Sequence, residues 1–381
     1  GTNEICKNID IDYLNFDLLH STLLENNISL VIVGPEIPLV EGIVDYLADK
    51  NIFAFGPSKK ASQLEGSKAF MKKVCQDFNI PTAAYEEFDN FEQAKKFINQ
   101  SKHPLVIKSD GLAAGKGVTI SQTAEQSVQC AKEILEGKFK TSKKVVIEEF
   151  LEGEEASYFI ITDGENYLPI GTAQDHKRIG ENDTGPNTGG MGAYSPSLLI
   201  TKELQEKINK EIIEPTIKGL NKIGCSFVGI LYAGLMIKDN QPKLIEYNIR
   251  FGDPECQVLM MRIDNDLIDL VLSVKNKNLL SQKIIWKENP CITIVAAAKG
   301  YPDEYRVETE IKNLENITTN STQQLFHAGT INKNGKILAN GGRVLNATSS
   351  ATNLKQARDK AHEMLNLVDW DDMYFRKDIG W

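Results

Sequence analysis

Short apolar runs that each end in a glycine turn constrain the fold of this chain most strongly. Leu30 to Val33 ends in Gly34-Pro35, and Ile52 to Phe55 ends in Gly56-Pro57, with a helical stretch between the two runs. Apolar strands that alternate with helices are typical of open α/β sheets, in which ligands bind beyond the carboxyl ends of the strands. Residues 1–65 are therefore predicted to be part of an open α/β domain.

The middle of the chain combines strands with two glycine-rich segments. Leu105 to Lys108 is expected to be a strand that leads into Gly111-Leu-Ala-Ala-Gly-Lys-Gly117. Further strands are expected at Val145–Glu149, Ala156–Thr162 and Tyr167–Ala173. Residues 105–173 should thus form a compact α+β unit that covers a ligand. The polar stretch from Gln174 to Tyr194 is expected to be a long functional loop without secondary structure.

The rest of the chain is expected to form a hairpin and then a separate lobe. Phe227 to Ile237 and Lys243 to Asn248 should pair as two strands, and the last hundred residues should be an α+β lobe with a hairpin around Asn334-Gly335. The predicted class is a multidomain protein of α/β and α+β type. Its expected domains are 1–65, 66–280 with 105–173 as a mobile lid, and 281–381.

Charge and cysteine usage exclude several classes of function. The 381 residues include 43 basic and 52 acidic ones, a net charge of -9, with no run of five or more like charges. This argues against a nucleic-acid or anionic-membrane surface, and the apolar runs are too short to span a bilayer. The six cysteines form no C-x-x-C pair and the five histidines show no ligand spacing, which indicates reduced thiols in a cytoplasmic protein without a zinc site. No signal-peptide pattern is visible.

The glycine-rich loop at 111–117 suggests phosphate binding, because glycine lets backbone N–H groups approach oxygen atoms closely. It fits neither the Walker A pattern nor G-x-G-x-x-G. A plain turn would explain such a loop as well, but the inward-facing Lys108 on the preceding strand favours phosphate.

Two further segments could carry chemistry. Glu148 to Glu155 places several carboxylates around a strand end, which an exposed hairpin edge would also explain. Glu246, Asn248 and Arg250 fall on one face of a strand, because residues two apart point the same way. Carboxylate and amide oxygens are hard ligands suited to Mg²⁺, although the alternation alone could mark an exposed strand face.

Together, in this order, the three segments resemble the ATP-grasp superfamily, in which two lobes hold ATP between them. Longer strings resemble the phosphoribosylamine-glycine ligase family within it, from Leu64-Glu-Gly-Ser-Lys68 to Arg376-Lys-Asp-Ile-Gly-Trp381. The strings between them are Asp110-Gly-Leu-Ala-Ala-Gly-Lys-Gly117, Gln174-Asp-His-Lys-Arg178, Asp183-Thr-Gly-Pro-Asn-Thr-Gly-Gly-Met-Gly-Ala-Tyr-Ser-Pro196, Arg250-Phe-Gly-Asp-Pro-Glu255, Phe326-His-Ala-Gly-Thr330 and Asn340-Gly-Gly-Arg-Val-Leu345. The resemblance implies an ATP-grasp fold with an N-terminal Rossmann-like domain and a C-terminal α+β lobe.

The resemblance also implies which residues bind ATP. The phosphates would be held by Lys68, Lys108, Gly115, Lys116 and Gly117. For the two lysines outside the loop, the alternative is a surface or snorkelling side chain. Glu148 and the backbone of Leu151 would form the adenine-binding hinge, and Glu155 would take the ribose hydroxyls, with Glu154 as a possible substitute.

The metal and the substrates are assigned by the same resemblance. Glu246 and Asn248 would bind Mg²⁺ or Mn²⁺, and Arg250 with Lys108 would be catalytic, although an ion pair with Asp253 is the alternative for Arg250. Substrate contacts are expected from Asp175, Lys177, Arg178, Asn187, Thr188, Gly189, Gly190 and Arg250.

The implied reaction joins glycine to 5-phosphoribosylamine with conversion of ATP to ADP and phosphate through a glycyl phosphate, in purine biosynthesis. The alternatives are another ATP-grasp purine enzyme, such as a carboxyaminoimidazole ribonucleotide synthase, and an ATP-binding protein without turnover. We expect no nucleic-acid or membrane partner and a monomer or weak homodimer. Members of the family begin with a strand and a Gly-Ser-Gly-Gly-Arg-Glu-His type loop, and this chain is expected to start beyond it.

Overall fold

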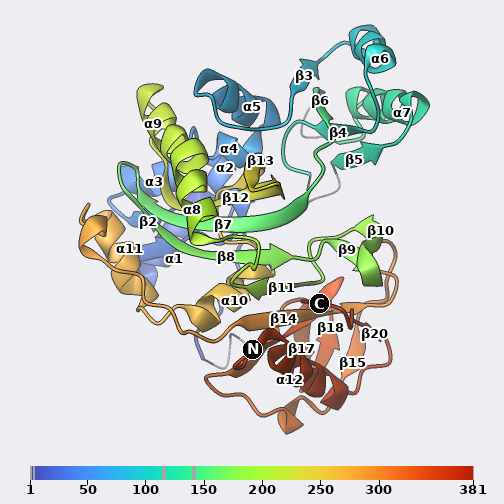
Figure 1. The fold of residues 1–381 in the computed structure, drawn as a ribbon. Helices are drawn as coiled ribbons and strands as arrows, with labels where there is room; N and C mark the ends of the chain where they lie inside the picture. Colours follow the sequence, from blue (N-terminus) through green and yellow to red (C-terminus); the bar gives the residue numbers. More distant parts are fainter. Residues whose placement is uncertain (1, 3–4, 114–116, 140–142, 381) are drawn as a thin grey trace.

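The computed structural model describes residue 2 and residues 5–113, 117–139 and 143–380. Figure 1 shows a central body of long strands and helices, a small lobe drawn in cyan at its upper right, and a C-terminal lobe drawn in orange and red below. No helix of the described residues is both long and apolar enough to cross a membrane. The active-site candidates lie where the small lobe, the body and the C-terminal lobe face each other.

The N-terminal domain has the expected α/β character. It contains α1 (Phe16–Glu25), β1 (Leu30–Ile32), α2 (Glu36–Glu41), α3 (Ile43–Asp49), β2 (Phe53–Phe55) and α4 (Gln63–Gly66). The two strands pair in parallel, with Leu30 opposite Phe53, and each is followed by a turn at the same edge. Gly34, Pro35 and Glu36 thereby reach the cavity described below.

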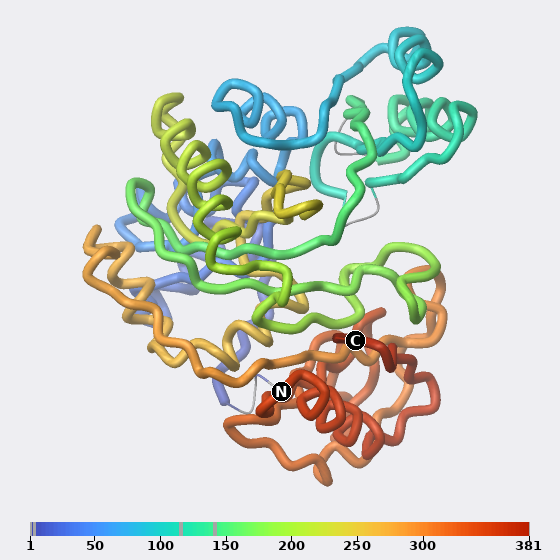
Figure 2. Tube along the Cα trace, in the orientation of Figure 1, coloured from blue at the N-terminus to red at the C-terminus, as the bar shows by residue number. Residues whose placement is uncertain are grey.

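The small lobe is a four-stranded antiparallel sheet with two helices packed on it. Its elements are β3 (Tyr85–Phe88), α6 (Phe91–Gln100), β4 (Leu105–Ser109), β5 (Val118–Ser121), α7 (Ala124–Leu135) and β6 (Val145–Glu149), in the sheet order β3-β6-β4-β5. Ile98, Ile107 and Ile134 are fully buried between the helices and the sheet. Figure 2 shows the chain entering this lobe after the blue helical segment and leaving it into the green strands of the body.

The lobe therefore differs from the expected 105–173 unit. It already includes β3 and α6, and its sheet ends at Glu149. The strands β7 (Glu154–Asp163) and β8 (Tyr167–Asp175) belong to the body instead. The physical reason is burial on both faces, because Tyr158 and Ile160 pack into one core whereas Phe159 and Ile161 pack into another.

A nine-stranded sheet joins the body to the C-terminal lobe. Besides β7 and β8 it contains β11 (Gly192–Ser195), β12 (Val228–Lys238), β13 (Gln241–Asn248), β14 (Cys291–Ala298), β16 (Gln323–His327), β19 (Arg343–Ser350) and β20 (Met373–Tyr374). The order is β13-β12-β7-β8-β11-β14-β19-β16, with β20 beside β14. The expected hairpin of β12 and β13 is confirmed. The C-terminal lobe has its own core but is not separate, because β11 pairs with β14.

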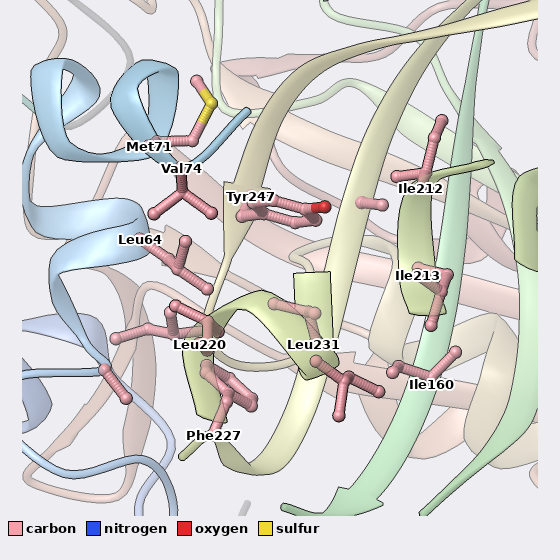
Figure 3. Close-up of a cluster of buried hydrophobic side chains, with 14 of the residues drawn as sticks. Leu64, Met71, Val74, Ile160, Ile212, Ile213, Leu220, Phe227, Leu231 and Tyr247 are labelled. Carbon is pink, nitrogen blue, oxygen red and sulfur yellow. The ribbon is translucent and has the colours of Figure 1, made fainter. Parts of the chain in front are cut away.

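Helices cover both faces of the body part of this sheet. One face carries α5 (Lys68–Asp77), α8 (Lys202–Ile208), a π-helical turn (Asn209–Ile213) and α9 (Glu214–Lys222). The other carries α10 (Glu255–Arg262) and α11 (Leu267–Lys275). Figure 3 shows Leu64, Met71 and Val74 facing Tyr247 and Leu220 across the first core. This packing fixes the amino end of α5 beside β13.

The C-terminal lobe and the connecting loops complete the fold. The lobe adds α12 (Leu354–Leu367) and a second sheet of β15 (Thr309–Ile311), β17 (Thr330–Lys333) and β18 (Lys336–Ala339), with the expected hairpin turn at Asn334-Gly335. Short 3₁₀ helices lie at Leu279–Ser281 and Leu314–Asn316. The expected structureless stretch from Gln174 to Tyr194 was wrong. It holds β9 (Arg178–Gly180), a 3₁₀ turn (Glu181–Asp183), β10 (Thr184–Asn187) and β11. The backbone is satisfied because β9 pairs with β10, and β11 pairs with β8 and β14.

Candidate active site

A cavity of about 620 Å³ lies between the small lobe, β13 and the loops from the other two domains. It collects most residues that the sequence singled out. Those lining it are Lys68, Lys108, Gly117, Glu148, Leu151, Glu155, Asp175, Lys177, Asn187, Thr188, Gly189, Glu246, Asn248 and Arg250. Glu155 lines the cavity, whereas Glu154 is not among the lining residues. Gly115 and Lys116 lie outside the described residues.

Two lysines mark the end of the cavity next to the small lobe. Lys108, on β4, is buried, and its Nζ lies 2.9 Å from Oε1 of Glu148. Lys68, at the start of α5, donates to the carbonyl oxygen of Gly111 at 2.9 Å. Burial lowers the pKa of Lys68, although the Glu246 carboxylate opposes this effect. Both ammonium groups therefore approach a cavity where additional negative charge would be stabilised.

Asp110 ties the glycine-rich loop to the amino end of α5. Its Oδ1 accepts from the hydroxyl of Ser67 at 3.0 Å and from the backbone N–H of Ala69 at 3.2 Å. Ser67 is itself the N-cap of that helix. At Gly117, a Cβ would lie 2.6 Å from the Cβ of Ala113, so the loop packs too closely for a larger residue there.

Glu246 and Asn248 project from β13 on the cavity side, as their two-residue spacing predicts. Lys177 lies 3.0 Å from Oε2 of Glu155 and 3.6 Å from Oε1 of Glu246. The Glu155 carboxylate raises the pKa of Lys177 well above its ordinary value. Burial opposes this rise, and the Glu246 carboxylate adds to it. Burial alone would raise the pKa of Glu246. The neighbouring Lys177, Lys108 and Lys68 lower it below its ordinary value. Glu246 is therefore held as an anion.

The donor set of this strand fits a hard divalent cation. One carboxylate and one amide oxygen on adjacent cavity-facing positions suit Mg²⁺, which binds through few protein ligands and completes its shell with phosphate oxygens and water. In the described part of the chain, no group of three His, Cys, Asp or Glu side chains could hold a metal ion. A metal at Glu246 and Asn248 would thus depend on a phosphate-bearing ligand for its remaining oxygens.

Arg250 is held by two carboxylates from the N-terminal side of the chain. Its Nε lies 3.1 Å from Glu36, and its Nη2 lies 3.1 Å from Glu65. The second oxygen of Glu65 accepts from the backbone N–H of Ile249 at 2.9 Å. Burial raises the pKa of Glu65 to about 7, with Arg250 opposing. The alternative expectation, an ion pair between Arg250 and Asp253, was wrong, because Asp253 pairs with an arginine of the C-terminal lobe.

That arginine is Arg343, which joins two loops at the far end of the cavity. Its Nη1 donates to the carbonyl oxygens of Gly189 at 2.7 Å and Asp253 at 2.8 Å, and its Nη2 lies 2.8 Å from the Asp253 carboxylate. Gly190 has φ +110°, and a Cβ there would lie 2.6 Å from Oδ1 of Asp175. The loop therefore fits closely between Arg343 and Asp175.

Asp175 itself is an unusual carboxylate. Its Oδ1 is buried and has no hydrogen-bond partner among the described residues. Burial and the neighbouring Glu255 carboxylate raise the pKa of Asp175 well above its ordinary value. Such an oxygen is well suited to a cationic donor from a ligand, since a buried acceptor without a partner is costly.

Arg178 is placed differently from the other expected substrate residues. It is not among the residues that line the cavity, and its Nη1 donates to the carbonyl oxygen of Gly185 at 2.7 Å. Its own carbonyl accepts from the fully buried Arg376 at 3.0 Å, and Arg376 also contacts Asp183 at 2.8 Å. A substrate contact of Arg178 stays a prediction.

Several polar cavity residues were not predicted from the sequence as site residues. Among them are Glu36, Glu65, Tyr232, Glu255 and Arg343. Glu65, Glu255 and Arg343 lie within strings that resemble the family, which was the signal available for them. Glu255 accepts from the hydroxyl of Ser157 at 3.2 Å, and Ser157 also contacts the hydroxyl of Tyr232 at 2.8 Å.

A cavity between a four-stranded lobe and the body, with paired lysines on one side and a Glu/Asn pair on the other, defines an ATP-grasp enzyme. Three sequence models of the phosphoribosylglycinamide synthetase family match the chain. Its N domain matches residues 1–65, its ATP-grasp (A) domain matches 66–256 and its C domain matches 291–381. The chain belongs to this family, as the sequence resemblance indicated.

Curated relatives are named phosphoribosylamine–glycine ligase. The protein of Brucella melitensis is 51% identical over 358 residues, covering 94% of this chain and 84% of the relative. The chloroplastic protein of Arabidopsis thaliana is 49% identical over 361 residues, covering 93% and 68%. The chain is thus an ATP-dependent ligase that joins glycine to phosphoribosylamine in purine biosynthesis. The names of the relatives favour this activity over the alternative of another ATP-grasp purine enzyme.

Solved structures agree on the fold. The phosphoribosylamine–glycine ligase of Thermotoga maritima has a TM-score of 0.79 at 33% identity, covering 86% of this chain and 82% of that one. The biotin carboxylase domain of the 2-oxoglutarate carboxylase of Hydrogenobacter thermophilus, solved with MgADP, has a TM-score of 0.76 at 18% identity, covering 96% and 81%. At that identity the second likeness supports the ATP-grasp fold alone.

Proposed function

We propose that the ligation proceeds in two steps within this cavity. A carboxylate oxygen of glycine attacks the γ-phosphorus of ATP, so that ADP leaves and glycyl phosphate forms. The amine of 5-phosphoribosylamine then attacks the acyl carbon, phosphate leaves, and the new amide loses a proton. The observation that carries the proposal is the convergence of lysines, carboxylates and the Arg250 guanidinium on one cavity.

ATP is assigned to the side of the cavity formed by the small lobe. Lys68 and Lys108 hold the phosphates, together with Gly117 and, by family resemblance, Gly115 and Lys116. The adenine lies against Glu148 and Leu151, and Glu155 receives the ribose hydroxyls. Cations and backbone N–H groups can spread the charge of the transferring phosphoryl group without forming a covalent bond.

Glu246 and Asn248 are assigned to Mg²⁺ or Mn²⁺. When bound, such an ion neutralises phosphate charge and orients the phosphates. Arg250 lies two residues beyond Asn248 on the same side and is assigned to stabilise the transferred phosphoryl group. Its pairing with Glu36 and Glu65 fixes the guanidinium plane without using every N–H, since guanidinium carries five.

Glycine is assigned to the end of the cavity lined by Asp175 and residues 187–189. The unpartnered Oδ1 of Asp175 would accept from the glycine ammonium group, and Lys177 lies next to it in the chain. Keeping that amine protonated matters chemically, because a neutral amine would compete with phosphoribosylamine for the acyl phosphate. Asn187, Thr188 and Gly189 would contact glycine or the ribose phosphate.

The small lobe is assigned as a lid. It joins the body through the segments near 81–84 and 150–153, so it can rotate over the nucleotide as one unit. Closing it would exclude water from the glycyl phosphate, which hydrolyses easily.

An isotope-transfer experiment tests the two-step chemistry. Glycine labelled with ¹⁸O in its carboxyl group should deliver one labelled oxygen to each phosphate released, because the attacking oxygen stays on phosphorus when the amide forms. Release of unlabelled phosphate during full turnover would contradict the acyl phosphate route.

We also propose that the chain works in the cytoplasm as a monomer or weak homodimer. All six cysteines are free thiols, as is common in a reducing compartment. The net charge of -9 opposes self-association at low salt. Sedimentation velocity over a range of protein concentrations would test the oligomeric state.

A further inference from the structure

The fully buried Arg376 is not among the residues that line the cavity, and the proposed mechanism does not use it. It belongs to the C-terminal tail, residues 373–380, which follows α12. Its Nε and Nη2 donate to the two oxygens of the Asp378 carboxylate, each at 2.8 Å. Its Nη1 donates to Oδ1 of Asp183 at 2.8 Å and to the carbonyl oxygen of Arg178 at 3.0 Å. One guanidinium thus joins the tail to residues 193 and 198 positions earlier in the chain.

The segment that Arg376 contacts is the hairpin of β9 and β10, residues 178–187. Every residue from 181 to 187 is exposed, so burial of apolar side chains does not fix this part of the hairpin. Its turn is also costly, because Asn182 at φ +54° and Asp183 at φ +52° both have left-handed backbone conformations. The polar contacts with the tail therefore decide where the hairpin lies.

Two further contacts join the tail to the backbone of the hairpin. The N–H of Asn182 donates to Oδ2 of Asp378 at 2.7 Å. The hydroxyl of Tyr374 donates to the carbonyl oxygen of Ile179 at 2.9 Å. Together with the bond from Arg376, the tail holds both β9 and the left-handed turn.

The hairpin is continuous with the cavity at both of its ends. Lys177 precedes β9, Thr188 follows β10, and both line the cavity. The N–H and the hydroxyl of Thr188 donate to the carbonyl oxygen of Lys177 at 2.7 and 2.8 Å. A shift of the hairpin would therefore move Asn187 and Thr188 relative to the rest of the cavity.

We propose that Arg376 is a positioning residue, which acts through the β9–β10 hairpin to hold Asn187 and Thr188 in place for glycine and phosphoribosylamine. The inference rests on the proposed assignment of residues 187–189 to these substrates. ATP is assigned to the side of the cavity formed by the small lobe, so its binding should not depend on Arg376.

The test compares these two substrates with ATP in the full chain. Arg376→Lys keeps the positive charge but loses the forked contacts. We expect kcat/KM for glycine and for phosphoribosylamine to fall about tenfold, mainly through KM, while the Kd of ATP measured by calorimetry does not change. Arg306→Lys is the matched control, because Arg306 also pairs with an aspartate of the C-terminal lobe, Asp372, but its side chain is 73% exposed.

A second variant breaks the same contact from the hairpin side. Asp183→Asn leaves the pair of Arg376 and Asp378 intact and changes a side chain that is 45% exposed, so the fold should tolerate it. Its kcat/KM for both substrates should fall about threefold. In the double variant with Arg376→Lys, the fall should be smaller than the product of the two single falls, because both changes break one contact.

Unchanged kcat/KM for both substrates in Arg376→Lys would overturn the proposal. So would a parallel loss of ATP affinity, which a general loss of structure would cause, or single falls that simply multiply in the double variant. If Arg376→Lys does not fold, Asp183→Asn decides alone by the same comparison. If the wild-type protein forms no ADP that depends on glycine, the proposed function fails instead.

Discussion

Replacing Arg343 by methionine should weaken the use of the two substrates without weakening ATP binding. Arg343 belongs to the C-terminal lobe, yet it holds the 187–190 loop against the Asp253 loop of the body. Methionine fills a similar space and offers no donor. The loop that we assign to glycine and phosphoribosylamine would then lose its lateral support, whereas Lys68 and Lys108 lie at the other end of the cavity.

The magnitude follows from the contacts. Arg343 makes three short contacts at 2.7, 2.8 and 2.8 Å, and its side chain is 20% exposed. Hydrogen bonds to charged groups contribute about 1.5–3 kcal/mol each, but solvent can replace part of this for a partly exposed group. We therefore expect a net loss of about 2–3 kcal/mol, which corresponds to roughly a 30- to 150-fold fall in kcat/KM for glycine.

A graded series makes the assay decisive. Arg343→Lys should fall between wild type and the methionine variant, because lysine keeps the charge but cannot make the forked contacts. Tyr301→Phe removes the hydroxyl that accepts from the N–H of Gly189 at 3.1 Å and should cost about 1 kcal/mol. Steady-state kinetics would be combined with calorimetry of ATP binding. Unchanged kcat/KM for glycine, or a parallel loss of ATP affinity, would refute the reasoning.

Three further predictions follow from single contacts. Asn248→Leu should lose metal-dependent ATP binding, whereas raised Mg²⁺ should partly restore Asn248→Asp; normal metal titration by the leucine variant would exclude the metal role. Gly190→Ala should lower kcat/KM for glycine more than tenfold, because φ is +110° and a Cβ would lie 2.5 Å from Pro254, while Gly335→Ala, at φ +78° in open space, should not. Burial and then Arg376 lower the pKa of His176 to about 4. As pH falls from 6.5 to 4, His176 therefore binds a proton in the unfolded chain but stays neutral in the folded chain. The free energy of unfolding should fall by about 3 kcal/mol over that range, and His176→Gln should flatten this part of a urea-denaturation series.

The strands with strong apolar patterns could be predicted from the sequence, and the weakly patterned ones could not. The hairpin of β12 and β13 was predicted because both strands are apolar and a polar turn separates them. The strand β3, Tyr-Glu-Glu-Phe from 85 to 88, is mostly exposed and carries no such signal. The small lobe was therefore placed too late in the chain. The continuity of the large sheet through β11 and β14 depends on pairing across about a hundred residues, which local patterns do not encode.

In the candidate site, too, some residues could be placed from the sequence and some contacts could not. Glu246 and Asn248 could be assigned to one face of a strand from their spacing alone. The partners of Arg250 could not, because Glu36 and Glu65 precede it by 214 and 185 residues and meet it only through the packing of the N-terminal domain on the body. Asp253 was the nearer carboxylate in the sequence, but the C-terminal lobe provides Arg343 to pair with it.

The central claim is that one cavity couples the cleavage of ATP to the joining of glycine and phosphoribosylamine. The most direct test measures ADP release by the wild-type chain with Mg²⁺ and ATP, with each substrate omitted in turn. We expect sustained ADP release only when glycine and phosphoribosylamine are both present, with one glycinamide ribonucleotide formed for each ADP. Equal ADP release without either substrate, or ATP binding with no ADP release in the complete mixture, would contradict it.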